Sequence, residues 1–349
     1  MKHIATAAAL LALAAGTASA QSSVTLFGIV DVNLRNVSNS GVGSNSTLNN
    51  NGLSSSRFGF RGVEDLGGGL KAGFWLESDI NPDTGTTNNG NGKLFARRST
   101  LSLMGNFGEI RLGRDLTPSG AFTYVFDPFG VIGVGGSANI ARYSGQATFF
   151  RADNAISYFL PNLGGVYGQA MVGLDEGVNP SAPGTGADRF ARAYTGGRLG
   201  YANGPIDVAV SYGSTKVDTT GGKFKTTGIG ASYDFGVAKL MTHYYSDKLL
   251  ALKENRFLLG VSVPLGAHEL RASYVRSDAT GGTAAYNASD ANQLALGYVH
   301  NLSKRTAMYG TASRISNKGG ATFAIAGGNP GITAGGKSSG YELGLRHSF

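Results

Sequence analysis

Few residues of this chain have the type and spacing that catalysis requires. Beyond the N-terminal segment the histidines are His243, His268, His300 and His347, and none of them stands at a metal-ligand spacing from carboxylates. The chain has no cysteine, which excludes thiol chemistry and disulfides. No Gly-x-Ser-x-Gly segment occupies a strand-to-helix turn, where a nucleophilic serine would stand. These residues predict that the protein is not an enzyme and needs neither a metal ion nor a cofactor.

One motif matches a nucleotide-binding pattern but lacks the elements that such a site needs. Residues 331–338, GITAGGKS, satisfy the phosphate-loop pattern. That loop works between a strand and a helix, whose first N–H groups hold the phosphate. Here a glycine-rich stretch precedes the match, and an alternating, strand-like pattern from Gly340 to Phe349 follows it. Because the chain has 55 glycines in 349 residues, chance matches are expected, and we predict no nucleotide site.

The arginines are the remaining residues with a clear chemical capability. A guanidinium group stays charged at any working pH and presents a rigid fork of donors, so it attracts anions. The chain carries 30 Lys and Arg against 22 Asp and Glu, a formal net charge of +8. These basic residues are dispersed and form no run, so we predict no binding to nucleic acid. What they do depends on the elements that position them.

The first 20 residues are predicted to be a signal peptide and not part of the fold. Lys2 lies in a short polar start, an apolar run extends from Ile4 to Ala15, and the small residues 18–20 (ASA) are typical of a cleavage site. The apolar run is shorter than the about 20 residues that a membrane-spanning helix needs. We expect residues 21–349 to form a single domain, whose net charge falls to +7 with the loss of Lys2.

Period-two alternation recurs through the mature chain and predicts an all-β fold. Apolar Phe74 and Leu76 alternate with Trp75 and Glu77, and the last nine residues alternate in the same way. The predicted strands, sixteen in number, are residues 22–36, 54–65, 70–80, 94–106, 109–117, 152–160, 166–174, 191–202, 205–215, 224–235, 237–247, 254–263, 268–278, 292–301, 304–315 and 338–349.

The connections between these strands alternate between tight turns and long polar loops. The long loops are residues 37–53, 81–93, 118–151, 175–190, 216–223, 279–291 and 316–337. An even number of strands with short connections at one end and long ones at the other is typical of an outer-membrane β-barrel. The barrel must close, because hydrocarbon offers no water to free backbone groups. Sixteen antiparallel strands leave an interior wide enough for an aqueous channel.

The connection from Pro118 to Phe150 differs from the others. It contains one acid, Asp127, and one base, Arg142, among many glycines and aromatics. Loops longer than about 12–15 residues are usually functional or disordered, and disorder requires low hydrophobicity and high charge. We therefore expect this third external loop to fold into the barrel and narrow the channel near mid-height.

Several segments resemble the general porins of Gram-negative outer membranes. They are VTLFG at 24–28, SRFGFRG at 56–62, EDLGGGLKA at 64–72, GNFGE at 105–109 and RLGR at 111–114. The resemblance covers the whole mature chain and is strongest to the anion-selective branch. It implies a homotrimer of 16-stranded barrels with an inward third loop at the constriction. It also implies that the terminal Phe349 is the signal for the machinery that inserts barrels into the outer membrane.

The resemblance further implies which residues line the constriction. An arginine cluster on the wall of such porins is matched here by Arg57, Arg97 and Arg151. The alternation around residues 97 and 98 is imperfect, so either arginine can face the lumen. The secondary candidates for the pore wall are Arg61, Arg98, Lys71, Arg111 and Arg114.

Acids are scarce around the inward loop. Asp127 lies within it and Asp115 just before it, whereas the resemblance implies several loop acids in porins that prefer cations. Asp127 can face the throat as a counterpart of the arginines. Because Asp before Pro favours turn initiation, it can instead cap a turn.

These features imply an integral outer-membrane channel, in contact with membrane lipid, through which small anionic and neutral hydrophilic solutes diffuse passively, with a preference for anions. At about 5 Å from an arginine, an anion gains roughly 1 kcal/mol in bulk water and about 3 kcal/mol at an effective dielectric near 20. A porin specific for phosphate or small organic anions is the alternative with the same fold. An outer-membrane barrel enzyme and a plugged adhesin are the alternatives from other classes.

Overall fold

The computed structural model describes residues 23–87, 92–146, 148–174, 193–217 and 222–349. The signal peptide predicted at residues 1–20 and the loop predicted at 175–190 lie outside these ranges. No helix within the described ranges is long and apolar enough to cross a membrane.

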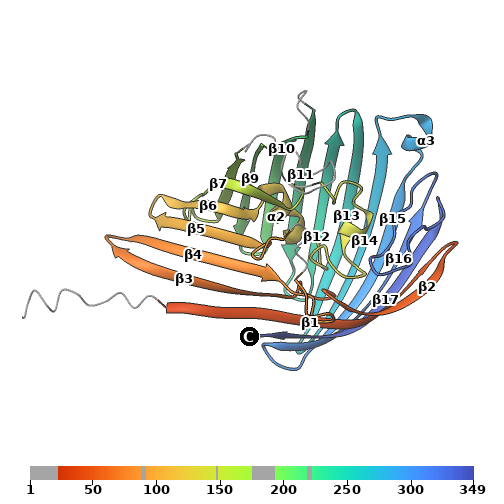
Figure 1. The fold of residues 1–349 in the computed structure, drawn as a ribbon, viewed down its shortest axis with the longest axis horizontal. Coiled ribbons are helices and arrows are strands. Elements are labelled where there is room, and N and C mark those ends of the chain that lie inside the picture. The colour runs from red at the N-terminus through yellow and green to blue at the C-terminus, as the bar shows by residue number, and fades with distance from the viewer. Residues whose placement is uncertain (1–22, 88–91, 147, 175–192, 218–221) are drawn as a thin grey trace, which may run out of the picture.

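The described strands form one antiparallel sheet that closes on itself (Figure 1). The closing pair is β1 with β17, whose register runs from Ile29 opposite Ser348 to Asn39 opposite Ser338. The strands of the first half are β1 (Ser23–Asn39), β2 (Gly43–Asn50), β3 (Arg57–Gly67), β4 (Leu70–Asp79), β5 (Arg98–Gly105), β6 (Gly108–Leu116), β7 (Arg151–Phe159) and β8 (Val166–Gly173). Those of the second half are β9 (Tyr194–Asn203), β10 (Ile206–Lys216), β11 (Lys223–Asp234), β12 (Lys239–Leu249), β13 (Leu252–Leu265), β14 (His268–Thr280), β15 (Ala291–Asn301), β16 (Thr306–Asn317) and β17 (Lys337–Ser348). The predicted all-β antiparallel barrel is confirmed.

Segments β2 and β3 together form one interrupted strand of the barrel. Both pair with β1, β2 with its second half and β3 with its first half. Between them the carboxylate of Asp31 accepts the N–H groups of Gly52, Leu53 and Ser54, at 3.2, 2.9 and 2.7 Å. Counting β2 and β3 as one gives the sixteen strands that were predicted. The prediction of a loop over 37–53 was wrong, because β1 extends to Asn39 and β2 pairs back on it.

The two faces of the sheet differ as a membrane barrel requires. In β15 the side chains of Leu294 and Leu296 are 55% and 59% exposed, whereas those of Gln293 and Ala295 are buried. Exposed large apolar residues recur in this way on strand after strand and form a continuous outer surface suited to lipid.

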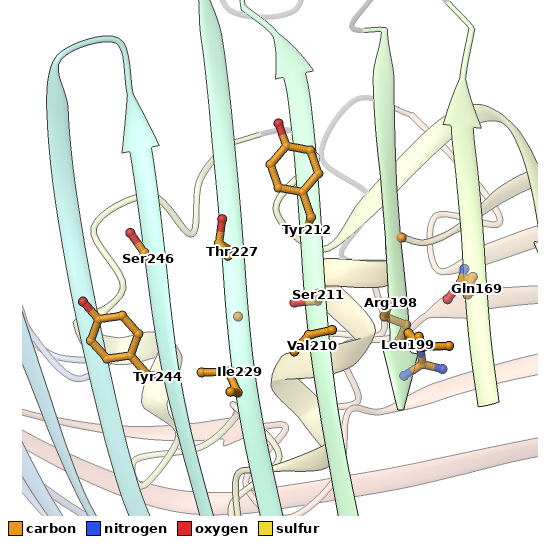
Figure 2. A pocket seen from close by; sticks show the side chains of 12 residues that line it. Gln169, Arg198, Leu199, Val210, Ser211, Tyr212, Thr227, Ile229, Tyr244 and Ser246 are labelled. Atoms are coloured by element: carbon orange, nitrogen blue, oxygen red, sulfur yellow. The ribbon is translucent and has the colours of Figure 1, made fainter. Parts of the chain in front are cut away.

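A hollow on this outer surface is not the functional site (Figure 2). Leu199, Val210, Ile229 and Tyr244, all on the exposed face of their strands, contribute to its lining. It is a depression between apolar side chains on the lipid side of β9–β12, so the solute path must lie within the barrel.

The tight turns and the long loops lie at opposite ends of the barrel. At the turn between β3 and β4, Gly67, Gly68 and Gly69 all have positive φ (84°, 61° and 83°), a conformation that other residues rarely adopt. In the described part of the long connections there are three short helices: α2 (Pro118–Val125), η1 (Ser137–Ile140) and α3 (Ala284–Asn287). None of these was predicted. The hydroxyl of Thr117 caps α2 by accepting the N–H of Gly120 at 3.0 Å.

Candidate pore constriction

The connection between β6 and β7 lies inside the barrel, as the sequence analysis predicted (Figure 1). Helix α2 contacts the wall at β8–β11, and its Phe122 and the adjacent Phe126 are 1% and 0% exposed. Glycines in the wall make this approach possible. A Cβ added to Gly230 would lie only 2.5 Å from the Phe126 ring and 2.9 Å from the Phe122 ring. The interior glycines of β11 therefore leave room for the aromatic side chains of the loop.

Polar side chains of the wall bind the backbone of the loop beyond α2. Buried Gln293 donates from Nε2 to the carbonyl oxygens of Gly135 (2.9 Å) and Gly136 (3.1 Å). The carboxylate of Glu254 on β13 accepts the N–H of Arg142 at 3.0 Å. These contacts hold the loop against β13 and β15.

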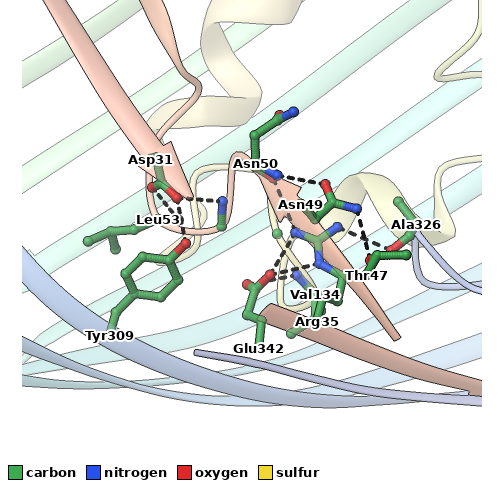
Figure 3. A network of polar contacts seen from close by, with 12 residues as sticks. Asp31, Arg35, Thr47, Asn49, Asn50, Leu53, Val134, Tyr309, Ala326 and Glu342 are labelled. Atoms are coloured by element: carbon green, nitrogen blue, oxygen red, sulfur yellow. Dashed lines mark hydrogen bonds and ion pairs between the residues drawn. The ribbon is translucent and has the colours of Figure 1, made fainter. Parts of the chain in front are cut away.

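A buried ion pair anchors the loop on the β1–β17 side (Figure 3). Arg35 donates from Nε and Nη2 to Glu342 Oε2 at 2.9 and 2.6 Å. The other oxygen of Glu342 accepts the N–H of Val134 in the loop at 3.1 Å. Arg35 also donates from Nη1 to the carbonyl of Ala326 at 3.1 Å. Removing either charge would leave its partner buried and unpaired, which costs several kcal/mol.

The three arginines assigned to the constriction lie together on the wall. Arg57 begins β3, Arg151 begins β7, and Arg97 directly precedes β5. These strands all run from the side of the long loops, so their first residues lie toward the same end of the barrel. The Nε of Arg151 donates to the carbonyl oxygen of Arg97 at 2.9 Å. Tyr124 of α2 lies near both Arg57 and Arg151, so the cluster and the loop border the same part of the channel.

Two acids that the sequence analysis did not single out lie within this cluster. Arg97 Nε is 2.5 Å from Glu77 Oε1, and its Nη1 is 3.0 Å from Asp79 Oδ1. Arg57 Nε is 3.9 Å from the same oxygen of Glu77. The side chain of Arg97 is 10% exposed and that of Arg57 is 29% exposed. The charge of Arg97 is therefore largely offset by the acids, whereas Arg57 presents more of its charge to the lumen.

Arg98 and Arg61 also point to the inner face, stacked on one tryptophan. Arg98 lies opposite Glu77 in the register of β4 and β5, with its guanidinium 4.6 Å from the centre of the Trp75 ring. The guanidinium of Arg61 is 5.0 Å from the Trp75 ring and 5.2 Å from that of Phe27. The sequence left open whether Arg97 or Arg98 faces the lumen. In the structure both side chains interact with groups of the inner wall.

Two further candidates, Arg111 and Arg114, are held in ion pairs. Arg111 contacts Glu109 at 2.8 Å and Asp115 at 2.5 Å. Arg114 Nη1 is 2.7 Å from Asp153 Oδ1. Asp115, which was considered as an acid of the inward loop, is buried beside Arg111. Arg114 also donates to the carbonyl oxygen of Ala96 at 2.5 Å, so this second set of ion pairs adjoins the three-arginine cluster.

Two named residues lie at the end of the barrel with the tight turns. Lys71 is exposed beside the turn between β3 and β4, opposite Asp65, and is remote from the cluster. Phe349 exchanges two backbone hydrogen bonds with Gly28, at 3.1 and 3.0 Å. A Cβ on Gly28 would overlap the Phe349 ring. The absence of a side chain at Gly28 therefore leaves room for the terminal ring.

Asp127 is buried and satisfies the backbone of its own loop. Its oxygens accept the N–H groups of Phe129, Val131 and Ser137, at 2.8, 3.2 and 3.1 Å. Burial raises the pKa of this carboxyl group, and the hydrogen bonds to it act in the opposite direction. Of the two interpretations left open, this geometry corresponds to the turn cap.

Within the described residues, the remaining motifs have neither the three-ligand grouping of a closed metal site nor the strand-loop-helix order of a phosphate loop. In the part of the chain that the structure describes, no three His, Cys, Asp or Glu side chains are grouped as metal ligands would be. The phosphate-loop match at 331–338 is irregular and leads directly into β17, with no helix after it.

Known proteins similar to this chain are channels of the same architecture. A model of the Gram-negative porins matches residues 6–320. Outer membrane porin protein 32 of Delftia acidovorans is 43% identical, and an outer membrane porin protein of Bordetella pertussis is 32% identical, each over the full length of both chains. Among solved structures, the anion-selective porin from Comamonas acidovorans superposes with a TM-score of 0.81 at 39% identity, covering 94% of this chain and all of that one.

Proposed function

The chain belongs to the Gram-negative porins and forms a non-enzymatic channel in the outer membrane, and from this premise we propose that the channel prefers anions. Small hydrophilic solutes would cross it by passive diffusion, limited in size by the loop that carries α2. Selectivity would arise from Arg57, Arg97 and Arg151.

The proposal rests on the arrangement of charged groups around Arg57, Arg97 and Arg151. Three guanidinium groups stand beside two carboxylates, Glu77 and Asp79, which leaves an excess of positive charge. Both acids contact Arg97, so the excess is presented by Arg57 and Arg151. An arginine keeps its charge at any working pH. The similar porin from Comamonas acidovorans is described as anion-selective, which supports the same sign here.

A reversal potential measured across unequal KCl concentrations tests the sign. When the protein is reconstituted into a planar bilayer, the reversal potential should have the sign expected when chloride permeates more readily than potassium. A potential of the opposite sign, or none, would refute the proposal. Conductance should rise with bulk salt. If it saturates and is blocked by phosphate or a small carboxylate, the channel is instead specific for such anions.

We further propose that residues 1–20 are removed on export and that the mature chain assembles as a homotrimer. The apolar run before residues 18–20 supports the first point, and similarity to porins supports the second. Intact-mass measurement of the protein from outer membranes should show a chain beginning at Gln21. Native mass spectrometry should show three chains per particle, and a single chain would contradict the trimer.

A further inference from the structure

Two histidines form a pair on the outside of the barrel. His268 on β14 and His300 on β15 are directly opposite in the strand register. Their Nδ1 atoms are 3.2 Å apart, and their rings are stacked with centres 4.6 Å apart and planes at 19°. The hydroxyl of Tyr298 lies 2.6 Å from Nδ1 of His268. None of these side chains contributes to the channel.

The pair lies at the rim of the barrel that faces the periplasm. His268 is the first residue of β14, immediately after the tight turn at residues 265–268, and short turns mark the periplasmic end. The neighbouring residues on the same outer face, Leu270 and Tyr298, are 46% and 44% exposed. An apolar residue and a tyrosine beside the pair are typical of the border between lipid and water. Ions in the periplasm can therefore reach the imidazoles.

The separation of the two nitrogens fits two ligands of one transition-metal ion. Imidazole nitrogens bind such ions at about 2.0–2.1 Å. Two such nitrogens at the square-planar to tetrahedral angles would lie about 3 Å apart, and the present separation of 3.2 Å is close to this value, although the stacked rings must first turn. Backbone hydrogen bonds between β14 and β15 fix the positions of both residues, so the pair is partly organised before an ion arrives.

The side chains around the pair favour copper over other divalent ions. Met308 on β16, exposed on the same outer face, is the register partner of His300. Cu²⁺ binds nitrogen donors most strongly in the first-row divalent series, whereas a thioether such as that of Met308 is a soft ligand that suits Cu⁺, the reduced ion. For binding, the stacked rings must turn about their Cβ–Cγ bonds until their lone pairs converge. His268 is exposed and His300 is half-buried, so this rotation disturbs little packing.

We propose that His268 and His300 form a surface site for a transition-metal ion, with Cu²⁺ preferred, at the periplasmic rim. Two imidazole nitrogens bind the ion, water occupies the other positions, and Tyr298 and Met308 border the site. The site is separate from the solute path and does not depend on the selectivity of the channel.

The test is a titration of the full chain, purified from outer membranes in detergent, with CuCl₂ at neutral pH. Calorimetry should show one Cu²⁺ per chain, and electron paramagnetic resonance should show two equatorial nitrogen ligands. His268→Asn and His300→Asn should each weaken binding about tenfold or more, because one of two protein ligands is lost. His347→Asn is the matched control. His347 lies near the same end of the barrel and bonds Thr306 instead, so its loss should leave binding unchanged.

Heat-modifiable migration on gels shows whether each variant has folded, and all three substitutions lie at strand ends near the surface. Equal affinity in the wild type and both pair variants would overturn the proposal. A spectrum with a single nitrogen ligand, unaffected by either substitution, would overturn it as well and would place the copper elsewhere, for example at the N-terminal amine.

Discussion

Replacing Arg57 with glutamine should reduce the anion preference of the channel about fivefold. Arg57 is the more exposed of the two arginines that contact Glu77, and its nearest carboxylate oxygen is 3.9 Å away. Glutamine keeps most of the length and the polarity of the side chain, so the change removes little more than one positive charge. It leaves the ion pairs of Arg97 with Glu77 and Asp79 in place.

The expected size follows from Coulomb's law. At about 5 Å in water, one unit charge changes the energy of a monovalent ion by about 0.8 kcal/mol. Screening at about 0.1 M salt reduces this to about 0.5 kcal/mol. The anion loses this energy and the cation gains it, so the ratio of their permeabilities changes by about 1 kcal/mol, or about fivefold. A lower effective dielectric in the throat would make the change larger.

The assay is the reversal potential in tenfold unequal KCl, with the permeability ratio taken from its value. Lys225→Gln is the matched control, because Lys225 is exposed on the outer face of β11 and its replacement removes the same charge. An Arg57→Gln channel with an unchanged ratio, or a Lys225→Gln channel with an equal change, would refute the electrostatic reasoning. Single-channel conductance should stay similar, because the size of the side chain is nearly retained.

Three further substitutions test one acid of the cluster and two contacts of the inward loop. Glu77→Gln should raise the anion preference, because it removes a negative charge from the cluster; a lower preference in the same assay would contradict this. Gly230→Leu should lower conductance by pushing the Phe126 ring and its loop toward the lumen, whereas Ala231→Leu on the opposite face should not. Gln293→Leu removes two hydrogen bonds to the loop, about 1–3 kcal/mol, and should increase the noise of the open-channel current; a quiet channel would show that the loop does not depend on this contact.

The barrel could be predicted from sequence because the pattern that defines each strand lies within a few consecutive residues. Each strand alternates with period two, and lipid on one side and water on the other make that alternation visible in residues such as Leu294 and Gln293. The error at residues 37–53 has a physical cause. β2 is GSNSTLNN, which is polar and has few β-branched residues. The carboxylate that holds the chain at the break after β2 belongs to Asp31, which lies outside the segment.

The constriction could be predicted only in part. The inward loop was inferred from its length and composition, but α2 was not, because Pro118–Val125 contains two aromatics and a β-branched pair that give no clear helical signal. The alternation along β4 predicts that the Glu77 side chain points to the inner face of the barrel. Its pairing with Arg97 could not be predicted, since that contact joins residues 20 positions apart across a loop.

The acids at the cluster explain how several arginines can stand together without lining the throat equally. Guanidinium groups held close together repel one another, and Glu77 and Asp79 relieve this repulsion at Arg97. With its side chain fixed, Arg97 offers its carbonyl oxygen to Nε of Arg151 and so positions the next arginine of the wall. The selectivity of the throat would then depend less on the number of arginines than on which of them the acids leave exposed. By this reasoning Arg97 acts mainly as a support, and the field that a permeating ion meets comes chiefly from Arg57 and Arg151.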